Sequence, residues 1–145
     1  MATLVDSNVL LDLFTEDAEW FDWSAAMLSR ASESGRVVVN PLVYAEVSVQ
    51  FERIEDLDEA LPVHYFAREA LPFDAAYLAG RAFMTHRRRG GTRTSPLPDF
   101  YIGAHAAVAG YTLLTRDPAR YRTYFPRLRI VAPQGSVIRN PRARS

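Results

Sequence analysis

This chain of 145 residues contains neither cysteine nor lysine. Without cysteine it cannot form a disulfide, a thiolate zinc site, an iron–sulfur cluster or a cysteine nucleophile. Without lysine, all 17 basic residues are arginines, which excludes Schiff-base chemistry and the lysine-dependent phosphate sites of P-loop and phosphotransfer proteins. Long apolar runs are also missing. The most apolar stretch, residues 104–114, is too short to span a bilayer, so we expect no contact with a membrane.

Charge is present in equal amounts of both signs but is divided along the chain. Residues 1–80 hold 15 acids and 4 arginines, a net charge of −11, whereas residues 81–145 hold 2 acids and 13 arginines, a net charge of +11. Such an asymmetry favours an anionic partner for the second half. Because the N-terminus lacks a basic segment followed by an apolar core, we expect no signal peptide and a cytoplasmic protein.

Short apolar runs alternate with helical patterns over most of the chain. The runs predict buried strands at 3–5, 37–39, 111–115 and 128–131, and the helices between them are predicted at 7–14, 20–34, 41–54, 74–89, 99–109 and shortly after Pro118. Residues 55–72 are expected to form a short helix and a connection. The alternation predicts an α/β fold with a parallel sheet in a single domain over residues 1–133. The basic segment 134–145 is expected to be a flexible tail.

Local signals predict where several helices begin and end. Ser7 and Asn8, Asn40 before Pro41, and Asp74 are expected to cap helices at their N-termini. Gly35 and Gly110 are expected to end helices. Residues 90–98, rich in glycine, threonine and proline, form the clearest predicted loop.

Four acids fall where a parallel α/β sheet gathers its functional groups. Asp6 directly follows the first predicted strand, and Asp117 follows the strand at 111–115. Glu46 lies within two turns of the start of the helix after the second strand, and Asp99 opens the helix at 99–109. Because functional groups collect beyond the carboxyl ends of parallel strands, these acids are expected to share one crevice. Each acid alone also has a structural interpretation, as a cap, a first-turn residue or an exposed helix residue.

Converging carboxylates require a cation. Two carboxylates about 5 Å apart repel by roughly 3 kcal/mol at an effective dielectric constant near 20. Ligation by oxygen alone selects a hard ion such as Mg²⁺ or Mn²⁺ rather than zinc. Such an ion binds substrate phosphates, and the chemistry that follows is hydrolysis of a phosphodiester by a metal-activated water.

Four motifs in order give the chain a resemblance to PIN-domain nucleases over residues 3–133. The first is the segment 6–11 (DSNVLL), and the second is the segment 43–47 (VYAEV). The third is the segment 98–106 (PDFYIGAHA), and the fourth is the segment 113–117 (LLTRD) together with Tyr121, Phe125, Pro126 and the closing strand. The length of the chain is similar to that of VapC-type toxins of bacterial toxin–antitoxin pairs.

The resemblance implies a fold, an activity and partners. The implied fold is a three-layer α/β/α sandwich around a parallel sheet, and the implied activity is that of a Mg²⁺-dependent endoribonuclease in which Mn²⁺ can substitute. A homodimer, an RNA substrate and a cognate VapB-type antitoxin are the implied partners. The acidic site is assigned to Asp6, Glu46, Asp99 and Asp117. Asp6, Asp99 and Asp117 are the implied metal ligands, with the first two the most direct, while Asn8 and Thr115 orient the acids or a water.

Other functions fit the residues less well. The phosphatases of the haloacid dehalogenase type also place an acid after the first strand, but they require a second aspartate at the position of Asn8. A receiver domain requires a lysine that the chain lacks. The alternative from another class is a non-catalytic, partner-regulated module that binds nucleic acid.

Several other residues carry narrower hypotheses. Arg87, Arg88, Arg89 and Arg93 lead toward Asp99 and are predicted to bind RNA phosphates, or else to form a solvated surface. Trp20, Phe21 and Trp23 belong either to the core or to a groove that receives an antitoxin helix. Asp12, Asp17 and Asp22 are expected at the solvated surface, and no metal role is expected for His64, His86 or His105.

Overall fold

The computed structural model describes residues 1–91 and 97–134, which form a sheet of five parallel strands covered by helices. The strands follow the order β3-β2-β1-β4-β5 across the sheet. Their bounds are β1 Thr3–Val5, β2 Val37–Val39, β3 Phe66–Arg68, β4 Thr112–Leu114 and β5 Ile130–Val131. The chain therefore adds strands on one side of β1, then returns to the centre and adds the last two strands on the other side.

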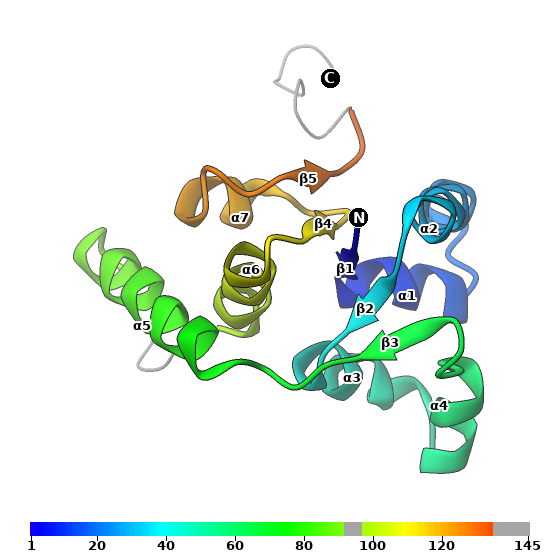
Figure 1. Cartoon of the computed structure of the whole chain (residues 1–145). Coiled ribbons are helices and arrows are strands. Elements are labelled where there is room, and N and C mark those ends of the chain that lie inside the picture. The colour runs from blue at the N-terminus through cyan, green and yellow to red at the C-terminus, as the bar shows by residue number, and fades with distance from the viewer. Residues whose placement is uncertain (92–96, 135–145) are drawn as a thin grey trace.

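Seven α-helices and one 3-10 helix connect the strands in the described residues. Their bounds are α1 Ser7–Phe14, α2 Phe21–Ser34, α3 Pro41–Val47, η1 Ser48–Gln50, α4 Ile54–Ala60, α5 Phe73–Arg88, α6 Pro98–Ala109 and α7 Ala119–Tyr124. Helices α1 and α2 lie on one side of the strands and α5 and α6 on the other (Figure 1). This confirms the predicted three-layer α/β/α sandwich around a parallel sheet.

The core follows from the residue types in the central elements. Strands β1, β2 and β4 are buried along their whole length, as expected for strands that are covered on both faces. Helix α6 contains several small residues, among them Gly103, Ala104 and Ala106, and these are buried. Because a small side chain adds little bulk, α6 can pack closely between the sheet, α5 and α7.

The helix ends partly follow the predictions. The side chain of Asn40 accepts a hydrogen bond from the Val43 N–H at 3.0 Å and caps α3, as predicted. Gly110 ends α6 with a φ of 74°, a left-handed conformation that glycine adopts without strain. Helix α1 is capped by Asp6 rather than by Ser7 or Asn8, because the Asp6 carboxylate accepts from the Ser7 N–H.

Two predicted helix ends differ in detail. Asp74 lies inside the first turn of α5 and makes no cap hydrogen bond; Pro72 occupies the N-cap position. Gly35 does follow α2, but its φ of 164° is extended rather than left-handed. A glycine is required there for another reason, since a Cβ at this position would collide with the backbone of Met1.

Strand β3 was not predicted from the sequence. It lies at the edge of the sheet, and only Phe66 of its three residues is buried. Such a short, half-exposed edge strand carries almost no hydrophobic signal, because its only partner strand supplies the pairing. Residues 92–96 of the predicted loop, which include Arg93, and residues 135–145 of the predicted tail lie outside the described residues.

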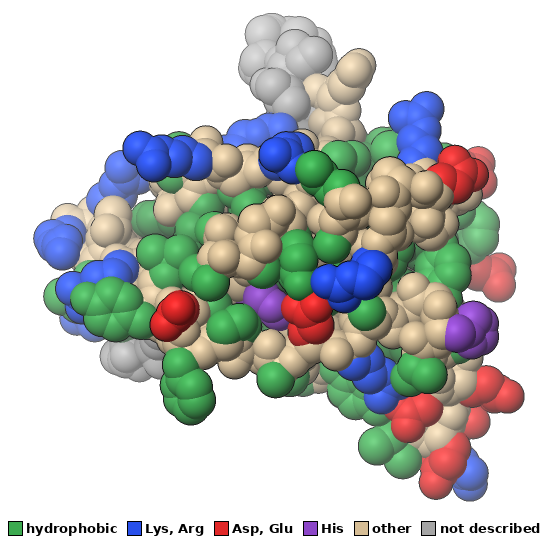
Figure 2. All heavy atoms as spheres, viewed as in Figure 1, with side chains coloured by type: hydrophobic (Ala, Val, Ile, Leu, Met, Phe, Trp, Pro, Cys, Tyr) green, Lys and Arg blue, Asp and Glu red, His purple; other side chains and the backbone are tan. Residues whose placement is uncertain are grey.

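The division of charge along the chain becomes a division in space. Figure 2 shows arginines gathered over α5 and along the side formed by α7 and β5, whereas acids gather over α4. Within the described ranges, none of the helices combines the length and the apolarity required to cross a membrane.

Candidate acidic active site

The candidate site lies where the order of the strands reverses. Strands β1 and β4 are neighbours, but the chain leaves β1 toward one side of the sheet and leaves β4 toward the other. The segments that follow two such strands diverge and leave a crevice at their carboxyl ends. Asp6 follows β1 directly, and its backbone N–H donates to the Leu114 carbonyl at the end of β4 at 2.9 Å.

Asp6 is the most enclosed of the four predicted acids, with 4% of its surface exposed. Its Oδ1 accepts from the Ser7 N–H at 2.8 Å. Its Oδ2 accepts from the hydroxyls of Thr115 at 2.8 Å and Tyr121 at 2.9 Å, and from Asn8 Nδ2 at 3.5 Å. These donors fix the orientation of the carboxylate, and none of them carries a positive charge.

Burial therefore dominates the protonation of Asp6. Loss of hydration raises its pKa from 3.8 to about 6, and the nearby negative charge of Asp99 adds to this rise. The hydrogen bonds from Thr115, Tyr121 and Ser7 lower the pKa but do not compensate. The site thus holds an anion at a free-energy cost, which a cation would remove.

Asn8 and Thr115 connect the segments that follow β1 and β4. The Thr115 hydroxyl accepts from Asn8 Nδ2 at 3.3 Å and from the Asp117 N–H at 3.1 Å. Asn8 Oδ1 accepts from the Arg116 N–H at 3.1 Å. The two side chains thus connect the segment after β1 with the segment after β4, on the two sides of the crevice.

Glu46 reaches the site from α3. Its Oε1 accepts from the Ser7 hydroxyl at 2.6 Å, so that Ser7 binds two of the acids, Asp6 through its N–H and Glu46 through its hydroxyl. Burial raises the pKa of Glu46, and the charge of Asp99 contributes to the rise. Glu46 and Asp6 therefore both respond to Asp99.

Asp99 lies in the first turn of α6 and is bound by two consecutive residues of α7. Arg120 forms an ion pair with Oδ2 at 3.1 Å, and the Tyr121 hydroxyl lies 3.3 Å from Oδ1. Both Asp99 and Arg120 are partly exposed to solvent, so this ion pair is accessible from outside. The sequence predicted no functional role for Arg120 or Tyr121, although Tyr121 is part of the fourth motif.

Asp117 stands apart from the other three acids. It is exposed, and its backbone N–H rather than its carboxylate is tied to the site through Thr115. The pKa of the neighbouring Arg116 guanidinium is raised mainly by its hydrogen bonds to Asp12, and the charge of Asp117 adds to this rise. The structure thus groups Asp6, Glu46 and Asp99 and leaves the carboxylate of Asp117 outside this group.

The chemistry of these donors fits a hard divalent cation. The groups are carboxylates and hydroxyls, and burial and mutual repulsion destabilise their charged forms. As they stand, no three histidine, aspartate or glutamate side chains of the described residues are grouped closely enough to hold an ion. In the present arrangement an ion would therefore have only one or two of these carboxylates as ligands, and waters would complete its shell.

Asp12 was expected at the surface, and this prediction is wrong. Only 2% of Asp12 is exposed. Its Oδ2 accepts from the Ser24 hydroxyl at 2.7 Å, and both of its oxygens accept from Arg116, at 2.8 and 3.0 Å. Asp17 is also more than a solvated residue, because its carboxylate accepts from the backbone N–H groups of Glu19 and Trp20.

The predicted RNA-binding arginines lie at the end of α5. Arg87, Arg88 and Arg89 are exposed, and the guanidinium of Arg89 lies over the ring of Tyr124 in α7. Helix α7 also carries Arg120 and Tyr121, so the arginine cluster borders the helix that contacts the acids. Arg93 lies outside the described residues.

The tryptophans and histidines have defined surroundings. Trp20 and Trp23 are partly buried and in edge-to-face contact, Trp23 packs against the core, and Phe21 is exposed. His105 is completely buried beside Asn40, and His86 contacts the Tyr124 hydroxyl.

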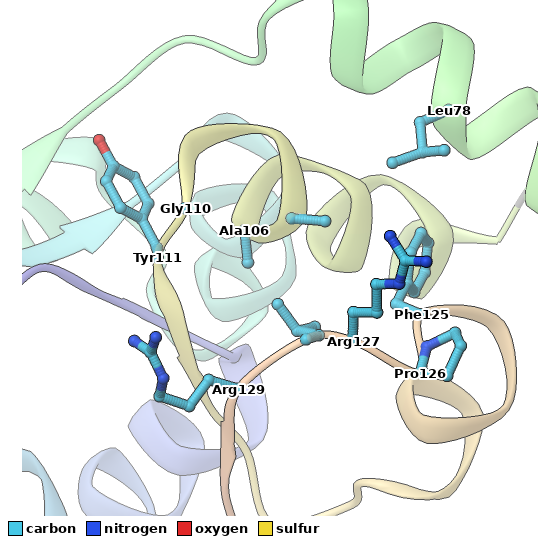
Figure 3. Close-up of a pocket in the computed structure, with 10 residues that line it drawn as sticks. Leu78, Ala106, Gly110, Tyr111, Phe125, Pro126, Arg127 and Arg129 are labelled. Carbon is cyan, nitrogen blue, oxygen red and sulfur yellow. The ribbon is translucent and has the colours of Figure 1, made fainter.

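A groove of about 490 Å³ lies away from the acids. It runs between α5, α6 and the segment that follows α7, and Leu78 faces Phe125 and Arg127 across it (Figure 3). None of the predicted acids lines this groove. It is therefore a separate surface feature and not the candidate active site.

Comparisons with known proteins agree with this geometry. The family model of the PIN domain matches residues 3–126. Among solved structures, the chain is similar to VapBC2 from Rickettsia felis bound to a promoter DNA fragment, with a TM-score of 0.70 and 14% identity over 92% of this chain and 99% of that one. VapBC-1 from nontypeable Haemophilus influenzae gives a TM-score of 0.69 and 16% identity over 91% and 98%.

A toxin–antitoxin complex from Klebsiella pneumoniae gives a TM-score of 0.58 and 20% identity over 89% of this chain and 95% of that chain. At these identities the likeness to solved structures establishes the fold. None of the curated proteins matches the chain at a significant level.

Proposed function

Because this chain belongs to the PIN domain family, we propose that it is a cytoplasmic, Mg²⁺-dependent endoribonuclease and the toxin of a type II toxin–antitoxin pair. PIN domains are in general nucleases, and the solved structures similar to this chain include VapBC complexes. The observation that carries the proposal is the group formed by Asp6, Glu46 and Asp99 at the reversal of strand order. Their charges destabilise one another and are opposed by one exposed arginine, Arg120.

Asp6 and Asp99 are the proposed ligands of a divalent ion. Asp117 is the proposed third ligand, and its exposed carboxylate would have to turn toward the crevice to reach the ion. Held there, such an ion would supply activation of a water and stabilisation of the charge that develops on the phosphate. Asn8 and Thr115 keep the Asp6 carboxylate in a fixed orientation. Glu46, held by Ser7, has a raised pKa and is suited to accept a proton from the attacking water.

The experiment is cleavage of single-stranded RNA with and without a chelator. Cleavage should stop with EDTA, return with Mg²⁺ or Mn²⁺, and be lost in Asp99→Asn while the protein stays folded. Asp22→Asn, at an exposed acid of α2, is the matched control and should cleave like wild type. Undiminished cleavage by Asp99→Asn would show that the acids do not form the active site.

Arg87, Arg88 and Arg89 are proposed to attract and hold the RNA backbone, and Arg93 is proposed to join them. Acids alone repel phosphates, so a neighbouring basic surface is needed to bind a substrate. Arg88→Ala/Arg89→Ala should weaken binding to all sequences and reduce the salt slope by about 0.7 for each phosphate that is no longer neutralised. Arg53→Ala, at the N-cap of α4, is the control, and a double mutant with an unchanged slope would assign these arginines to a solvated surface.

A VapB-type antitoxin is the proposed protein partner, docked near Trp20, Phe21 and Trp23. The exposed Phe21 and the paired tryptophans offer an apolar surface, and a basic side chain from the antitoxin could oppose the acids. Trp23→Ala should weaken the complex by ~1–3 kcal/mol. Since Trp23 also packs against the core, Phe21→Ser serves as the probe that leaves the core intact. Antitoxin affinity unaffected by both changes would place the partner elsewhere.

A homodimer is proposed to form through α5. Phe73 is 93% exposed and Tyr77 69% exposed, and both are on α5, which contributes Leu78 to the groove. Large exposed aromatic side chains on one helix are typical of an interface. Tyr77→Arg should convert a dimer into a monomer in sedimentation experiments, and a wild-type chain that sediments as a monomer would contradict this proposal.

A further inference from the structure

We infer that Tyr121 is a positioning residue, whose hydroxyl holds the carboxylates of Asp6 and Asp99 in the arrangement that a divalent cation meets. The inference rests on the proposed function, because it concerns the same acids. It adds a residue that is neither an acid nor one of the predicted neighbours Asn8 and Thr115.

The contacts of Tyr121 place one hydroxyl between two carboxylates. Its oxygen lies 2.9 Å from Asp6 Oδ2 and 3.3 Å from Asp99 Oδ1. Among the described residues, Tyr121 is the side chain whose hydrogen bonds reach both acids. Thr115 and Ser7 bind Asp6, and Arg120 binds Asp99, so without the Tyr121 hydroxyl the two carboxylates would be held by separate sets of partners.

The hydroxyl is fixed because the whole side chain is buried. Tyr121 has 1% of its surface exposed and is among the largest fully buried side chains of the chain. A buried tyrosine hydroxyl requires a partner, and here both partners are acids. A hydroxyl in this environment cannot turn toward solvent, so its position between the two acids is fixed.

The packing of α7 on α6 brings the hydroxyl to the acids. Gly103 lies one turn after Asp99 on α6, and a Cβ at Gly103 would stand 2.5 Å from Phe125 and 3.0 Å from the ring of Tyr121. The glycine therefore lets α7 approach α6 closely enough for Tyr121 to reach past it to the acids. The same close packing of α7 on α6 brings Arg120 to Oδ2 of Asp99.

The fixed position matters because the acids repel each other. Two carboxylates repel each other and move apart unless neighbouring groups hold them. As their separation grows, a small ion can no longer contact both. Residues that orient metal ligands typically change metal affinity by about 10–100-fold when they are altered. The single hydrogen of the Tyr121 hydroxyl is shared between Asp6 Oδ2 and Asp99 Oδ1, whereas Asp6 Oδ1 accepts from the Ser7 N–H and Asp99 Oδ2 pairs with Arg120.

The test is binding of Mn²⁺ to the full chain, measured by electron paramagnetic resonance of the free ion, for wild type and Tyr121→Phe. The variant keeps the ring and removes only the hydroxyl, so we expect an affinity about tenfold weaker. Tyr124→Phe is the matched control. It removes a hydroxyl of the same helix that contacts His86 instead of the acids, and it should bind Mn²⁺ like wild type.

The outcomes separate this inference from the proposed function. If Tyr121→Phe binds Mn²⁺ within twofold of wild type while Asp99→Asn does not bind it, Tyr121 is only a packing residue and the proposed function stands. If wild type binds no Mn²⁺ at millimolar concentration, both are overturned. A loss of thermal stability with unchanged affinity also marks a packing role.

A second measurement keeps the test valid if Tyr121→Phe does not fold. Replacing Tyr121 by 3-fluorotyrosine keeps the hydroxyl, and its ¹⁹F resonance should shift when Mg²⁺ is added. The same label at Tyr124 should not shift. An unshifted resonance at position 121, under conditions where Mg²⁺ protects the protein against heat, would overturn the inference.

Discussion

Asp6 and Asp12 lie six residues apart and are both almost completely buried, but their surroundings differ in one respect. Asp12 is bound through both oxygens by the guanidinium of Arg116 and by the Ser24 hydroxyl. Asp6 is bound by uncharged donors only, and its nearest charged influence is another acid, Asp99. Asp6 lacks a permanent counter-charge, and Asp12 has one.

The difference separates an acid that stabilises the fold from an acid that is available for chemistry. A buried carboxylate with a permanent cation cannot bind another one without breaking the pair. A buried carboxylate without a cation lowers the stability of the empty protein and gains from any cation that enters. Burial alone therefore does not mark a candidate functional acid, whereas burial without a counter-charge does.

The largest expected effect comes from breaking the Asp12 pair. Arg116→Ala leaves Asp12 buried and unpaired, so we expect a loss of about 3–5 kcal/mol in the free energy of unfolding. Urea denaturation measures it. Arg53→Ala, which removes exposed ion pairs with Glu55 and Asp56, should change stability by less than about 1 kcal/mol. A similarly small loss in Arg116→Ala would remove the distinction between the two aspartates.

The pH dependence of stability should reveal Asp6. Because its pKa is raised to about 6 in the folded state, the folded chain binds more protons than the unfolded chain between about pH 4 and pH 6. Its contribution to stability therefore falls as pH rises through this window, by about 3 kcal/mol in total, and the loss remains at pH 7.

Asp6→Asn removes this titration, so its stability measured with a chelator should exceed that of wild type at pH 7 and fall less from pH 4 to pH 6. The gain should be smaller than the full 3 kcal/mol, about 1–2 kcal/mol, because the amide accepts fewer hydrogen bonds. If Asp6→Asn is less stable than wild type at pH 7, Asp6 has a structural role like that of Asp12.

Added metal should stabilise one aspartate region and leave the other unchanged. At a Mn²⁺ concentration about one hundred times its Kd, wild type should gain about 2.7 kcal/mol. Arg116→Ala should gain the same amount, because its acid site is intact, whereas Asp99→Asn should gain nothing. Thermal denaturation with and without Mn²⁺ measures these gains, and an equal gain in Asp99→Asn would place the ion elsewhere.

The smallest expected effect sharpens the comparison on the Asp12 side. The guanidinium of Arg116 lies over the ring of Trp20 at 5.4 Å. Trp20→Leu should therefore lose about 0.5–1 kcal/mol of this interaction beyond the change in packing. The double variant with Arg116→Ala isolates it, since the two single losses should exceed the combined loss by that amount. Strict additivity would show that the ring does not contribute to holding Arg116.

The sequence predicted the features that depend on neighbouring residues. The valine run at 37–39, the asparagine and proline that begin α3, and Gly110 after α6 were confirmed because each is a local signal. The acids after β1 and β4 could be located from the strand ends alone. That the Asp117 carboxylate lies outside the group could not be predicted, because it depends on how the chain turns after β4.

The features that the sequence did not predict depend on distant partners. Asp12 is buried by Ser24 and Arg116, and the latter lies 104 residues away. A charged residue on an amphipathic helix offers no signal for such a partner. Tyr121 reaches Asp6 across 115 residues, and only through the close packing that Gly103 permits. In the same way, residues 66–68 form strand β3 because they pair with β2, and not because of their own residue types.

The position of β1 at the centre of the sheet has a consequence for the time at which the acids come together. Strand β1 is among the first parts of the chain to be synthesised, but its neighbour β4 and the helix that carries Tyr121 come more than 100 residues later. A chain is synthesised from its N-terminus. During most of translation Asp6 therefore lacks the hydrogen bonds from Thr115 and Tyr121. Such long-range pairing also folds slowly. The proposed active site is therefore incomplete in a nascent chain until α7 has emerged and packed.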